Sequence, residues 1–530
     1  MPDRISPLIL FRNQTFRSLW IAALASNFGG LVQAVGAAWL MTSLSESQNM
    51  VALVQGSVAL PIMIFSLLAG VFADNFDRRR VMLIAQSFMF GVSILLTFMA
   101  FEGWLTPWLL LAFTFSIGCG TALHNPSWPS AVSLNSMGFN LMRSIGPAAG
   151  GAIVAIAGAA AAFAVNALSY VAIILALLRW KAPLRDTHLP REPMGSAFSA
   201  GLRYVAMSPN LMRVILRGFW FGLSAIALLA LLPVVVRETL QATAFVYGIM
   251  LGCFGMGAVF GALTNAALRA RFRNEIIARG GFVGFALSCA VLAVSTHPAL
   301  SGGALMLAGA CWVLSLSMFN VTIQLSTPRW VVGRVIALYQ TGTFGGMAAG
   351  SLIWGIVADR GGPEVALAGA SVMLLIGALI GLPLPLPEFS GLNLDPLNRF
   401  KEPDTRFDLS YRSGPVMVMV DYEIAQSDVP EFLAAMSLRR RVRIRDGAQQ
   451  WALLRDLHRP EHWSESYHVP TWAEYVRHNE RRTNADAGLS DQLRRLHRGE
   501  TPPEVHRMIE RQTVPLRDDM LQKEGAIDAA

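Results

Sequence analysis

Long apolar runs follow one another from about residue 16 to residue 386, and short polar segments separate them. Each run is close to the roughly 20 residues that an α-helix needs to cross the hydrocarbon core of a bilayer. The pattern predicts twelve spanning helices, at about residues 17–41, 51–73, 81–101, 107–124, 131–157, 159–178, 212–236, 243–268, 276–296, 300–324, 334–357 and 364–386. The fifth and sixth runs meet through the apolar stretch AGAAAAF, so eleven is the alternative count.

Basic residues gather in alternate connections between these runs. They precede the first run, follow the second at residues 78–80, occupy the central segment after the sixth and follow the eighth. The segments TSLSESQNM, FEGWLTP and STHPALSGG, on the other side, contain no Lys or Arg. Short loops rich in Lys and Arg stay in the cytoplasm during insertion. We therefore expect both chain ends in the cytoplasm and the helices in the cell inner membrane.

Composition agrees with a membrane protein, because 53% of the 530 residues are hydrophobic and the mean hydropathy is +0.45. The net charge of +8 does not require a nucleic-acid partner, because residues 1–387 hold 22 basic and 11 acidic groups while residues 388–530 hold 21 and 24. Membrane topology explains the excess, and no separate basic domain is left to bind nucleic acid. The four cysteines lie in apolar runs without pairing or metal-binding spacing, which predicts packing roles.

The segment GVFADNFDRRR joins the second and third apolar runs. Glycine at its first position allows another helix to approach closely, and an Asp precedes an Arg by four residues, the favourable order for an ion pair on a helix. The segment resembles the G-x-x-x-D-x-x-D/G-R-R/K signature of the major facilitator superfamily. The resemblance implies a latch of the cytoplasmic gate that involves Gly70, Asp74, Asp77, Arg78 and Arg79. An ordinary basic loop is the alternative.

A second stretch, ALHNPSWPSAVSLNSMGFNLMRSIGPAAGG, covers the fifth run and the end of the fourth. Its last residues, Gly146, Pro147, Gly150 and Gly151, resemble the end of the antiporter signature of the same superfamily, although the earlier glycines of that signature are absent. Together with NALSYV, the stretch is similar to the exporter branch that includes enterobactin and macrolide efflux proteins, with a shorter connection after Trp128. The resemblance implies alternating access and proton antiport. The segment STPRWVVGRVIALYQ, before the eleventh run, is similar to NPSWPSAVSLNS, before the fifth. Two related halves of the helical region would explain this internal similarity.

Few charged side chains are expected inside the membrane. Arg143 lies about halfway along the fifth run, where an ionised group is costly and usually functional. His124, at the end of the fourth run, is the other titratable candidate, because an imidazole titrates near neutral pH. The superfamily lines its cavity with helices one, four, seven and ten, which here contribute Asn27, Gln33, Trp220, Asn320 and Gln324. This mostly apolar lining suits an amphipathic organic molecule, whereas hydrogen bonds between helices are the structural alternative for each residue.

The composition changes after Pro387. Residues 388–414 form a Pro-rich polar linker, residues 415–515 alternate strand-like and helix-like patterns, and residues 516–530 form a tail. The strand-like PVMVMVDYEI, a helix capped by Asp428 and the helical TWAEYVRHNERRT predict a ferredoxin-like α+β domain. It resembles the appended domain of the exporter branch, itself similar to small monooxygenases, but Tyr475 stands where those often have His. His458 and His462 lack companion ligands, so no metal site is expected.

These observations predict an all-α membrane protein of two six-helix halves, residues 1–200 and 201–387, with a cytoplasmic α+β domain. We expect an exporter, not an enzyme, that moves an amphipathic small molecule such as a siderophore or a drug across the lipid bilayer in exchange for protons. No cofactor is expected, and the α+β domain would form a homodimer or regulate transport. Two alternatives stay open: oxidation of a small molecule by that domain, and a lipid-handling or sensory protein without net efflux.

Overall fold

The computed structural model describes residues 14–75, 77–124, 132–180, 192–388, 393–397, 399–407 and 409–510. The chain divides into two compact units. The first comprises Met1–Leu184, Asn210–Ile323 and Ile336–Glu388, and the second comprises Arg185–Pro209, Gln324–Val335 and Phe389–Ala530. The second unit therefore combines segments from the middle and from the end of the chain.

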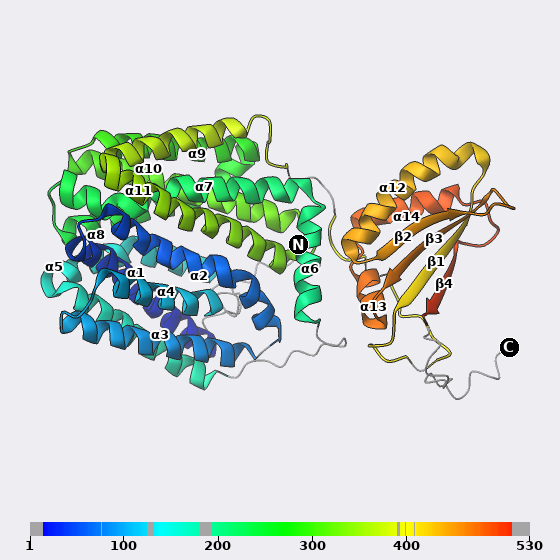
Figure 1. Cartoon of the computed structure of the whole chain (residues 1–530), viewed down its shortest axis with the longest axis horizontal. Helices are drawn as coiled ribbons and strands as arrows, with labels where there is room; N and C mark the ends of the chain where they lie inside the picture. The colour runs from blue at the N-terminus through cyan, green and yellow to red at the C-terminus, as the bar shows by residue number, and fades with distance from the viewer. Residues whose placement is uncertain are drawn as a thin grey trace. The chain divides into compact units, whose positions relative to one another are not determined.

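The first unit is a bundle of long helices, in which Figure 1 shows α1–α4 grouped together and α7–α11 grouped beside them. The helices are α1 (Gln14–Leu44), α2 (Gln48–Asn75), α3 (Arg78–Phe101), α4 (Pro107–His124), α5 (Val132–Arg179), α7 (Pro209–Val234), α8 (Ala244–Arg271), α9 (Asn274–Val294), α10 (Pro298–Leu325) and α11 (Val332–Ile380). A short π-helical turn, Val235–Thr239, continues α7. In the described part of the chain, ten helices are long and apolar enough to cross a membrane.

Two of these helices are about twice the usual length and break at a glycine. The 48-residue α5 breaks at Gly158, where φ is 79°, and the 49-residue α11 breaks at Gly362, where φ is 85°. A positive φ costs glycine little and is unfavourable for other residues, so these two positions interrupt the helical path. The first break lies where the fifth and sixth predicted spans meet, and the second lies between the last two. The count of twelve crossings stays a prediction.

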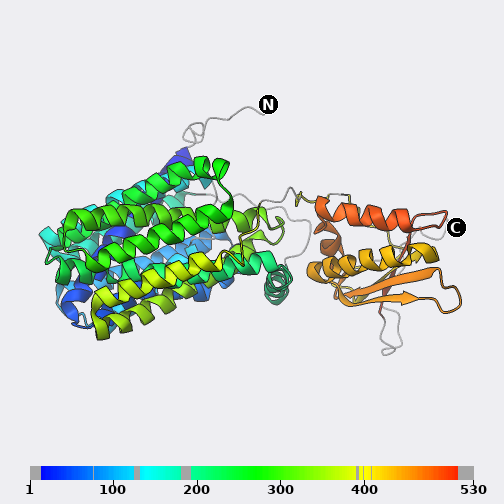
Figure 2. The same ribbon diagram turned by 90° about the horizontal axis from the view of Figure 1, so that it is seen from above.

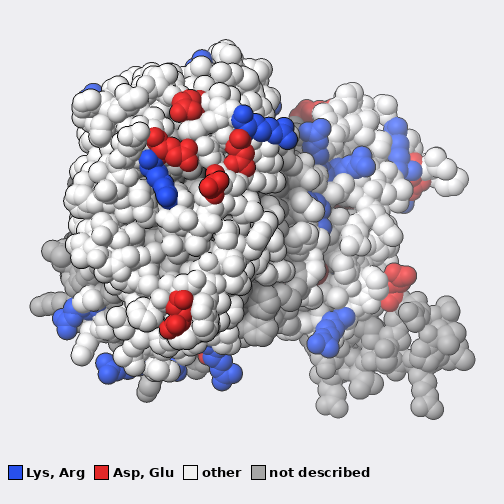
Figure 3. Space-filling view, turned by 60° about the vertical axis from the view of Figure 1, so that its left-hand side comes forward, with Lys and Arg blue, Asp and Glu red and all other residues white. Residues whose placement is uncertain are grey.

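The surface of the first unit is that of a protein in lipid. Large apolar side chains remain exposed, among them Ile84 at 69%, Ile156 at 87% and Leu263 at 76%. Figure 3 shows a largely uncharged surface with charged side chains in a few groups. Inside the second half of the bundle, Phe221 of α7 packs against rings of α9 and α10, with the centroid of the Phe282 ring 5.1 Å away. Figure 2 shows the long helices of the same bundle from above.

The second unit contains an antiparallel sheet of four strands in the order β2-β3-β1-β4. Its elements are β1 (Val416–Glu423), α12 (Val429–Asp446), β2 (Gln449–Arg455), β3 (His462–Val469), α13 (Trp472–Glu480), α14 (Asn484–Leu496) and β4 (Glu504–Ile509). The order of strands and helices is that of a ferredoxin-like unit. Alternate residues of β1, namely Val416, Val418, Val420 and Tyr422, are buried, which confirms the strand inferred from PVMVMVDYEI.

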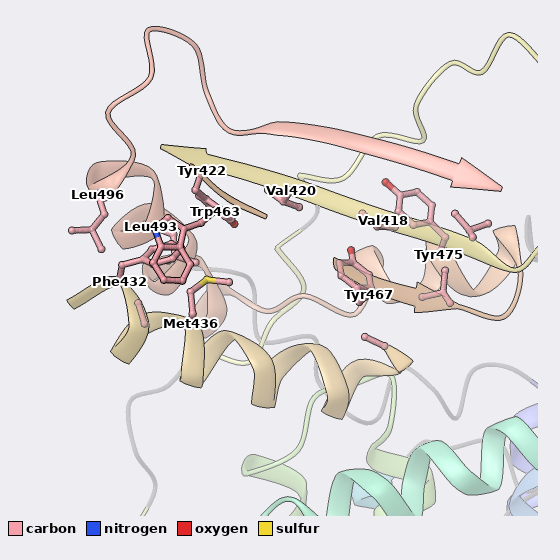
Figure 4. Close-up of a cluster of buried hydrophobic side chains, with 14 of the residues drawn as sticks. Val418, Val420, Tyr422, Phe432, Met436, Trp463, Tyr467, Tyr475, Leu493 and Leu496 are labelled. Carbon is pink, nitrogen blue, oxygen red and sulfur yellow. The ribbon is translucent and has the colours of Figure 1, made fainter. Parts of the chain in front are cut away.

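The core of this α+β domain lies between the sheet and its helices. Figure 4 shows Phe432 and Met436 of α12 directed toward Trp463 of β3. Asp428 occupies the N-cap position of α12, as expected, but its side chain makes no capping hydrogen bond. The carboxylate instead accepts a hydrogen bond from Arg498 Nη2 at 2.9 Å. An acceptor that binds a nearby guanidinium is not available to the first turn of the helix.

Segments from the middle of the chain pack within the same unit. The helix α6 (Met194–Ala206) brings Tyr204 edge-on to Trp330, with ring centroids 5.8 Å apart. Glu192, just before α6, pairs with both Arg334 and Arg481. The guanidinium of Arg481 also lies 4.5 Å from the centre of the Trp330 ring. Residues far apart in sequence are thus joined by one shared carboxylate and by aromatic contacts.

Candidate functional site

The segment GVFADNFDRRR forms a tight joint between α2 and α3. α2 ends at Asn75 and α3 begins at Arg78, with Asp77 as its N-cap. The Asp77 carboxylate accepts a hydrogen bond from the backbone N–H of Arg79 at 2.9 Å, which satisfies one of the free donors at the start of the helix. Asp77 also lies 3.9 Å from Arg80 Nε. Asp77 therefore has a local role in ending one helix and beginning the next.

Arg79 connects this joint to the end of α5. Its Nε donates to the carbonyl oxygen of Leu177 at 2.9 Å, and its Nη2 donates to that of Leu178 at 2.6 Å. A cation is favourable at the C-terminal end of a helix, where the last carbonyl groups lack intrahelical partners. The side chains of Gly70, Asp74 and Arg78 lie outside the described part of the structure, so their predicted latch stays a prediction.

The glycines of the fifth predicted span lie where helices come closest. A Cβ added to Gly151 would lie 2.6 Å from Gly248 Cα, and one added to Gly248 would lie 2.8 Å from the carbonyl oxygen of Pro147. Gly150 faces α1 in the same way, 3.0 Å from Val32 Cα, and Gly146 faces Leu31. The glycines thus let α5 touch the backbones of α1 and α8. The side chain of Arg143 lies outside the described residues.

Polar contacts join the two halves at the end of the bundle where α1 leads into α2, here named the α1–α2 end. Asp359 of α11 accepts from Ser47 Oγ at 2.9 Å and from the backbone N–H of Asn49 at 3.1 Å. Gln48 Nε2 donates to Glu238 at 3.0 Å, and Arg237 Nη1 donates to Thr42 Oγ1 at 2.9 Å. The halves are therefore tied together at this end by several hydrogen bonds.

The close approach of α5 and α8 lies near the same end. Trp39, in the last two turns of α1, stacks on Tyr247, with ring centroids 5.9 Å apart. Tyr247 directly precedes Gly248, the residue that contacts Gly151. The glycine contact and the hydrogen bonds of Asp359 thus act together to close the α1–α2 end.

Gln33, a predicted cavity residue, belongs to a buried polar cluster between helices. Its Oε1 accepts a hydrogen bond from Asn166 Nδ2 of α5 and another from Ser93 Oγ of α3 at 3.4 Å. Asn166 also donates to Tyr170 Oη at 3.2 Å. These contacts favour the interhelical interpretation of Gln33. Sequence reasoning missed Asn166 and Ser93, because isolated polar residues in an apolar run do not reveal their partners.

The other predicted cavity residues are spread over several environments. Trp220 Nε1 donates to the carbonyl oxygen of Met373 at 2.8 Å, so its polar atom is satisfied between helices. His124 Nδ1 lies 3.1 Å from Gln86 Nε2. Asn27 is partly exposed on α1, Asn320 is partly exposed on α10, and Gln324 is exposed in the last turn of α10.

A buried ion pair that the sequence patterns did not indicate lies in the second half. Arg217 of α7 pairs with Glu275 in the first turn of α9, and the same carboxylate oxygen accepts the backbone N–H of Leu386 at 2.8 Å. The Arg217 guanidinium also lies 5.7 Å from the centre of the Phe282 ring. A buried pair with additional hydrogen bonds holds neighbouring elements in one register.

The sequence profile of the transmembrane secretion effectors matches residues 5–513. The chain belongs to this family, within the major facilitator superfamily. It is a membrane transporter and not an enzyme. The match includes the α+β domain as well as the helical bundle.

Curated relatives of this secretion effector are transporters. The chain is 23% identical to a staphyloferrin A transporter from Staphylococcus aureus, over 44% of this chain and 62% of that protein, which is less than two thirds of its length. It is 25% identical to an enterobactin exporter from Salmonella choleraesuis, over 63% of this chain and 82% of that protein. It is 21% identical to the multidrug efflux pump Tap from Mycolicibacterium fortuitum, over 69% of this chain and 94% of that protein.

Solved structures support the same fold. The nucleoside transporter NupG matches with a TM-score of 0.59 and 12% identity, over 70% of this chain and all of that one. A bacterial homologue of the lysosomal transporter Spinster matches with a TM-score of 0.57 and 14% identity, over 72% and 99%. At these identities the likeness concerns the fold alone.

The α+β domain of this secretion effector shows structural roles for the residues that suggested chemistry. Tyr475 is buried, stacks on Trp472 and accepts a hydrogen bond from Arg507 Nε at 2.6 Å. The described residues contain no group of three or more His, Cys, Asp or Glu side chains placed to hold a metal ion. His458 donates its backbone N–H to Asp456 at 2.8 Å, as part of a turn.

Proposed function

We propose that this chain exports an amphipathic small molecule from the cytoplasm across the inner membrane by alternating access, in exchange for protons. The observation that carries the proposal is the way the two halves of the bundle meet at the α1–α2 end. Gly151 meets Gly248 backbone to backbone, and Asp359 holds Ser47 and Asn49 by hydrogen bonds. Such contacts can separate without disturbing the packing inside either half, as alternating access requires.

The direction of opening follows from the proposed topology. If α5 and α11 are each counted as two crossings at Gly158 and Gly362, the bundle has twelve and both chain ends lie on one side. The distribution of Arg assigns that side to the cytoplasm. The α1–α2 end then faces outward and is closed. Substrate would enter this state from the cytoplasm, and breaking the Asp359 contacts would open the path outward.

The joint between α2 and α3 would transmit that movement. Arg79 holds the start of α3 to the end of α5 through hydrogen bonds, and Asp77 caps α3 beside it. These helices would therefore move with the rest of the first half as one body. In this proposal Asp74 and Arg78 form the latch that closes the cytoplasmic end when the outer end is open, and Arg143 faces the aqueous path.

The proposed substrate class rests on the relatives and on the polar groups of the bundle. Relatives are named as transporters or exporters of the siderophores staphyloferrin A and enterobactin and as a multidrug efflux pump. The polar atoms of Gln33 and Trp220 are engaged between helices, so they offer a ligand little hydrogen bonding. A path with few free polar groups favours a molecule with apolar surface over a sugar.

Transport into everted membrane vesicles tests the proposal. Vesicles containing the chain should accumulate a siderophore or drug from a defined panel, and collapsing the proton gradient should stop accumulation. Vesicles without the chain provide the background. Accumulation that is unaffected by loss of the proton gradient would remove antiport from the proposal. Absence of transport for the whole panel, with correctly inserted protein, would remove the substrate class.

A further inference from the structure

A cleft in the α+β domain carries more positive charge than its carboxylates neutralise. It lies among α12, α13 and α14, and its charged lining includes Arg439, Arg443 and Arg482. Glu465 of β3 is the carboxylate directly behind it, and two of these arginines share it. Arg443 Nε lies 3.1 Å from Glu465 Oε1, and Arg439 Nε lies 3.5 Å from Glu465 Oε2.

Each carboxylate oxygen of Glu465 already has an arginine partner. Its Oε1 also accepts a hydrogen bond from Trp451 Nε1 at 3.0 Å. Burial opposes ionisation of Glu465, but Arg443 and Arg439 outweigh it and lower the pKa of Glu465 to about 2. Glu465 is therefore fully charged at neutral pH, and Arg439 and Arg443 share its single charge.

The two aspartates of the cleft are committed elsewhere. Arg445 binds Asp446 Oδ1 through Nε at 2.9 Å and Asp486 Oδ2 through Nη2 at 3.2 Å. Asp486 also completes the capping box of α14 by accepting from the backbone N–H of Thr483 at 3.1 Å. Neither carboxylate makes a hydrogen bond or an ion pair with Arg482 among the described residues.

His478 adds no compensating charge. Its Nε2 lies 3.0 Å from Arg443 Nη1, which can only donate, so this imidazole nitrogen accepts and the ring is neutral. Burial, together with the neighbouring arginines, holds the pKa of His478 well below its usual range. In the described part of the chain, the side chain of Arg482 has no hydrogen-bond acceptor, and burial beside Arg443 and Arg439 lowers its pKa to about 10.

We propose that this cleft binds a compact oxyanion of the phosphate class, with Arg482 as its principal ligand and Arg439 and Ser490 beside it. Ser490 Oγ accepts from Arg439 Nη1 at 3.0 Å and donates over a long 3.5 Å to the carbonyl oxygen of Asp486, so its proton can turn to an anion. A buried guanidinium without a counter-charge is costly, and an oxyanion with several acceptor oxygens removes that cost. The planar fork of Arg suits such an oxyanion. Free phosphate and a phosphorylated headgroup or metabolite share this chemistry.

Binding of inorganic phosphate to the purified full chain in nanodiscs of neutral lipid tests the site. In a buffer that contains chloride, equilibrium dialysis with labelled phosphate should detect one binding site. Added sulfate should compete with phosphate for that site. Arg482→Gln should weaken binding roughly ten- to hundredfold, because one charged hydrogen-bonding group is lost. Arg482→Lys should bind with intermediate affinity. Arg495→Gln, at an exposed position of α14 outside the cleft, is the matched control and should bind like the unaltered chain.

The stability of the domain, measured by hydrogen exchange, distinguishes an anion-binding role of Arg482 from a purely structural one. In phosphate-free buffer, hydrogen exchange of α13 and α14 in Arg482→Gln should be as slow as in the unaltered chain or slower, because an uncompensated charge is removed. Added phosphate should slow exchange there only when Arg482 is present. If free phosphate fails to bind, binding to vesicles that contain phosphatidic acid tests whether the ligand is a phosphorylated lipid headgroup. Failure of both probes, or faster exchange in Arg482→Gln without phosphate, would overturn the proposal.

Discussion

The crossing of α5 and α8 gives the sharpest test of alternating access, through the variant Gly151→Ala. Its new Cβ would lie 2.6 Å from Gly248 Cα and 2.8 Å from the carbonyl oxygen of Ala244, both backbone atoms that cannot rotate away. Carbon atoms in ordinary contact lie about 3.5–4.0 Å apart, so the two backbones would have to separate by roughly 1 Å. Such overpacking costs about 1–3 kcal/mol.

That cost shifts the balance between conformations. A state in which the α1–α2 end is open does not hold these two backbones in contact, so it escapes the penalty. At 1.4 kcal/mol for each factor of ten, the variant should favour the open state roughly 5- to 150-fold more than the unaltered chain does. We therefore expect Gly151→Ala to open the outer end and to slow export, because the closed state is needed in each cycle.

Cysteine labelling measures the shift directly. Met41, near the end of α1, has no exposed surface, so Met41→Cys in a chain without its four native cysteines should react slowly with a membrane-impermeant maleimide applied from outside. Gly151→Ala should raise that rate by the factor given above. Gly91→Ala on α3, where an added Cβ meets nothing within 4 Å, is the matched control. An unchanged rate in a correctly inserted Gly151→Ala chain would refute the reasoning.

Three further predictions concern charged groups. Asp359→Asn weakens the hydrogen bonds to Ser47 and Asn49, so it should raise the same labelling rate, by up to roughly tenfold; a rate equal to that of the parent chain would exclude Asp359 from closure. The variant Arg143→Lys should retain part of the transport rate and Arg143→Ala should lose most of it, because only Lys keeps a positive charge. An Arg143→Ala variant that transports at the parent rate would assign Arg143 a structural role. Glu465→Gln leaves Arg439 and Arg443 without their carboxylate and should cost the α+β domain about 3–5 kcal/mol at pH 7, measured by hydrogen exchange of β3 in the full chain. Because the pKa of Glu465 is lowered from 4.5 to about 2, its contribution is complete above pH 4.5 and is lost as the pH falls toward 2, so the two proteins should converge in acid; a constant difference would contradict this account.

Regular elements could be predicted from the sequence because their signals are local. The apolar runs fixed the positions of the long helices, and the alternation in β1 indicated which of its side chains are buried. The glycine break at Gly158 also lies at the predicted junction of two spans. By contrast, the sequence HWSESYHV of β3 does not indicate a buried strand, because the fully buried Glu465 is charged and meets its partners Arg443 and Trp451 only in the folded domain.

The candidate site was harder to predict because its contacts join distant residues. Asp359 lies near a predicted helix end, where an acidic residue is unremarkable, and its partner Ser47 is 312 residues away. Arg217 could be explained by topology alone, yet it is buried against Glu275. Only the packing of whole helices decides whether such a group meets water, a partner or a ligand.

Arg481 and Arg482 show the same limit at two consecutive positions. The sequence gives no reason to distinguish them, and both side chains are largely removed from water. Arg481 is held by Glu192 at 3.2 Å, Glu474 at 3.6 Å and the face of Trp330, so its charge is compensated by residues of three separate segments. Arg482, turned toward the cleft, lies beside two further arginines that share one carboxylate. The difference in partners thus assigns Arg481 a structural role and, in the proposal, makes Arg482 the ligand for an anion.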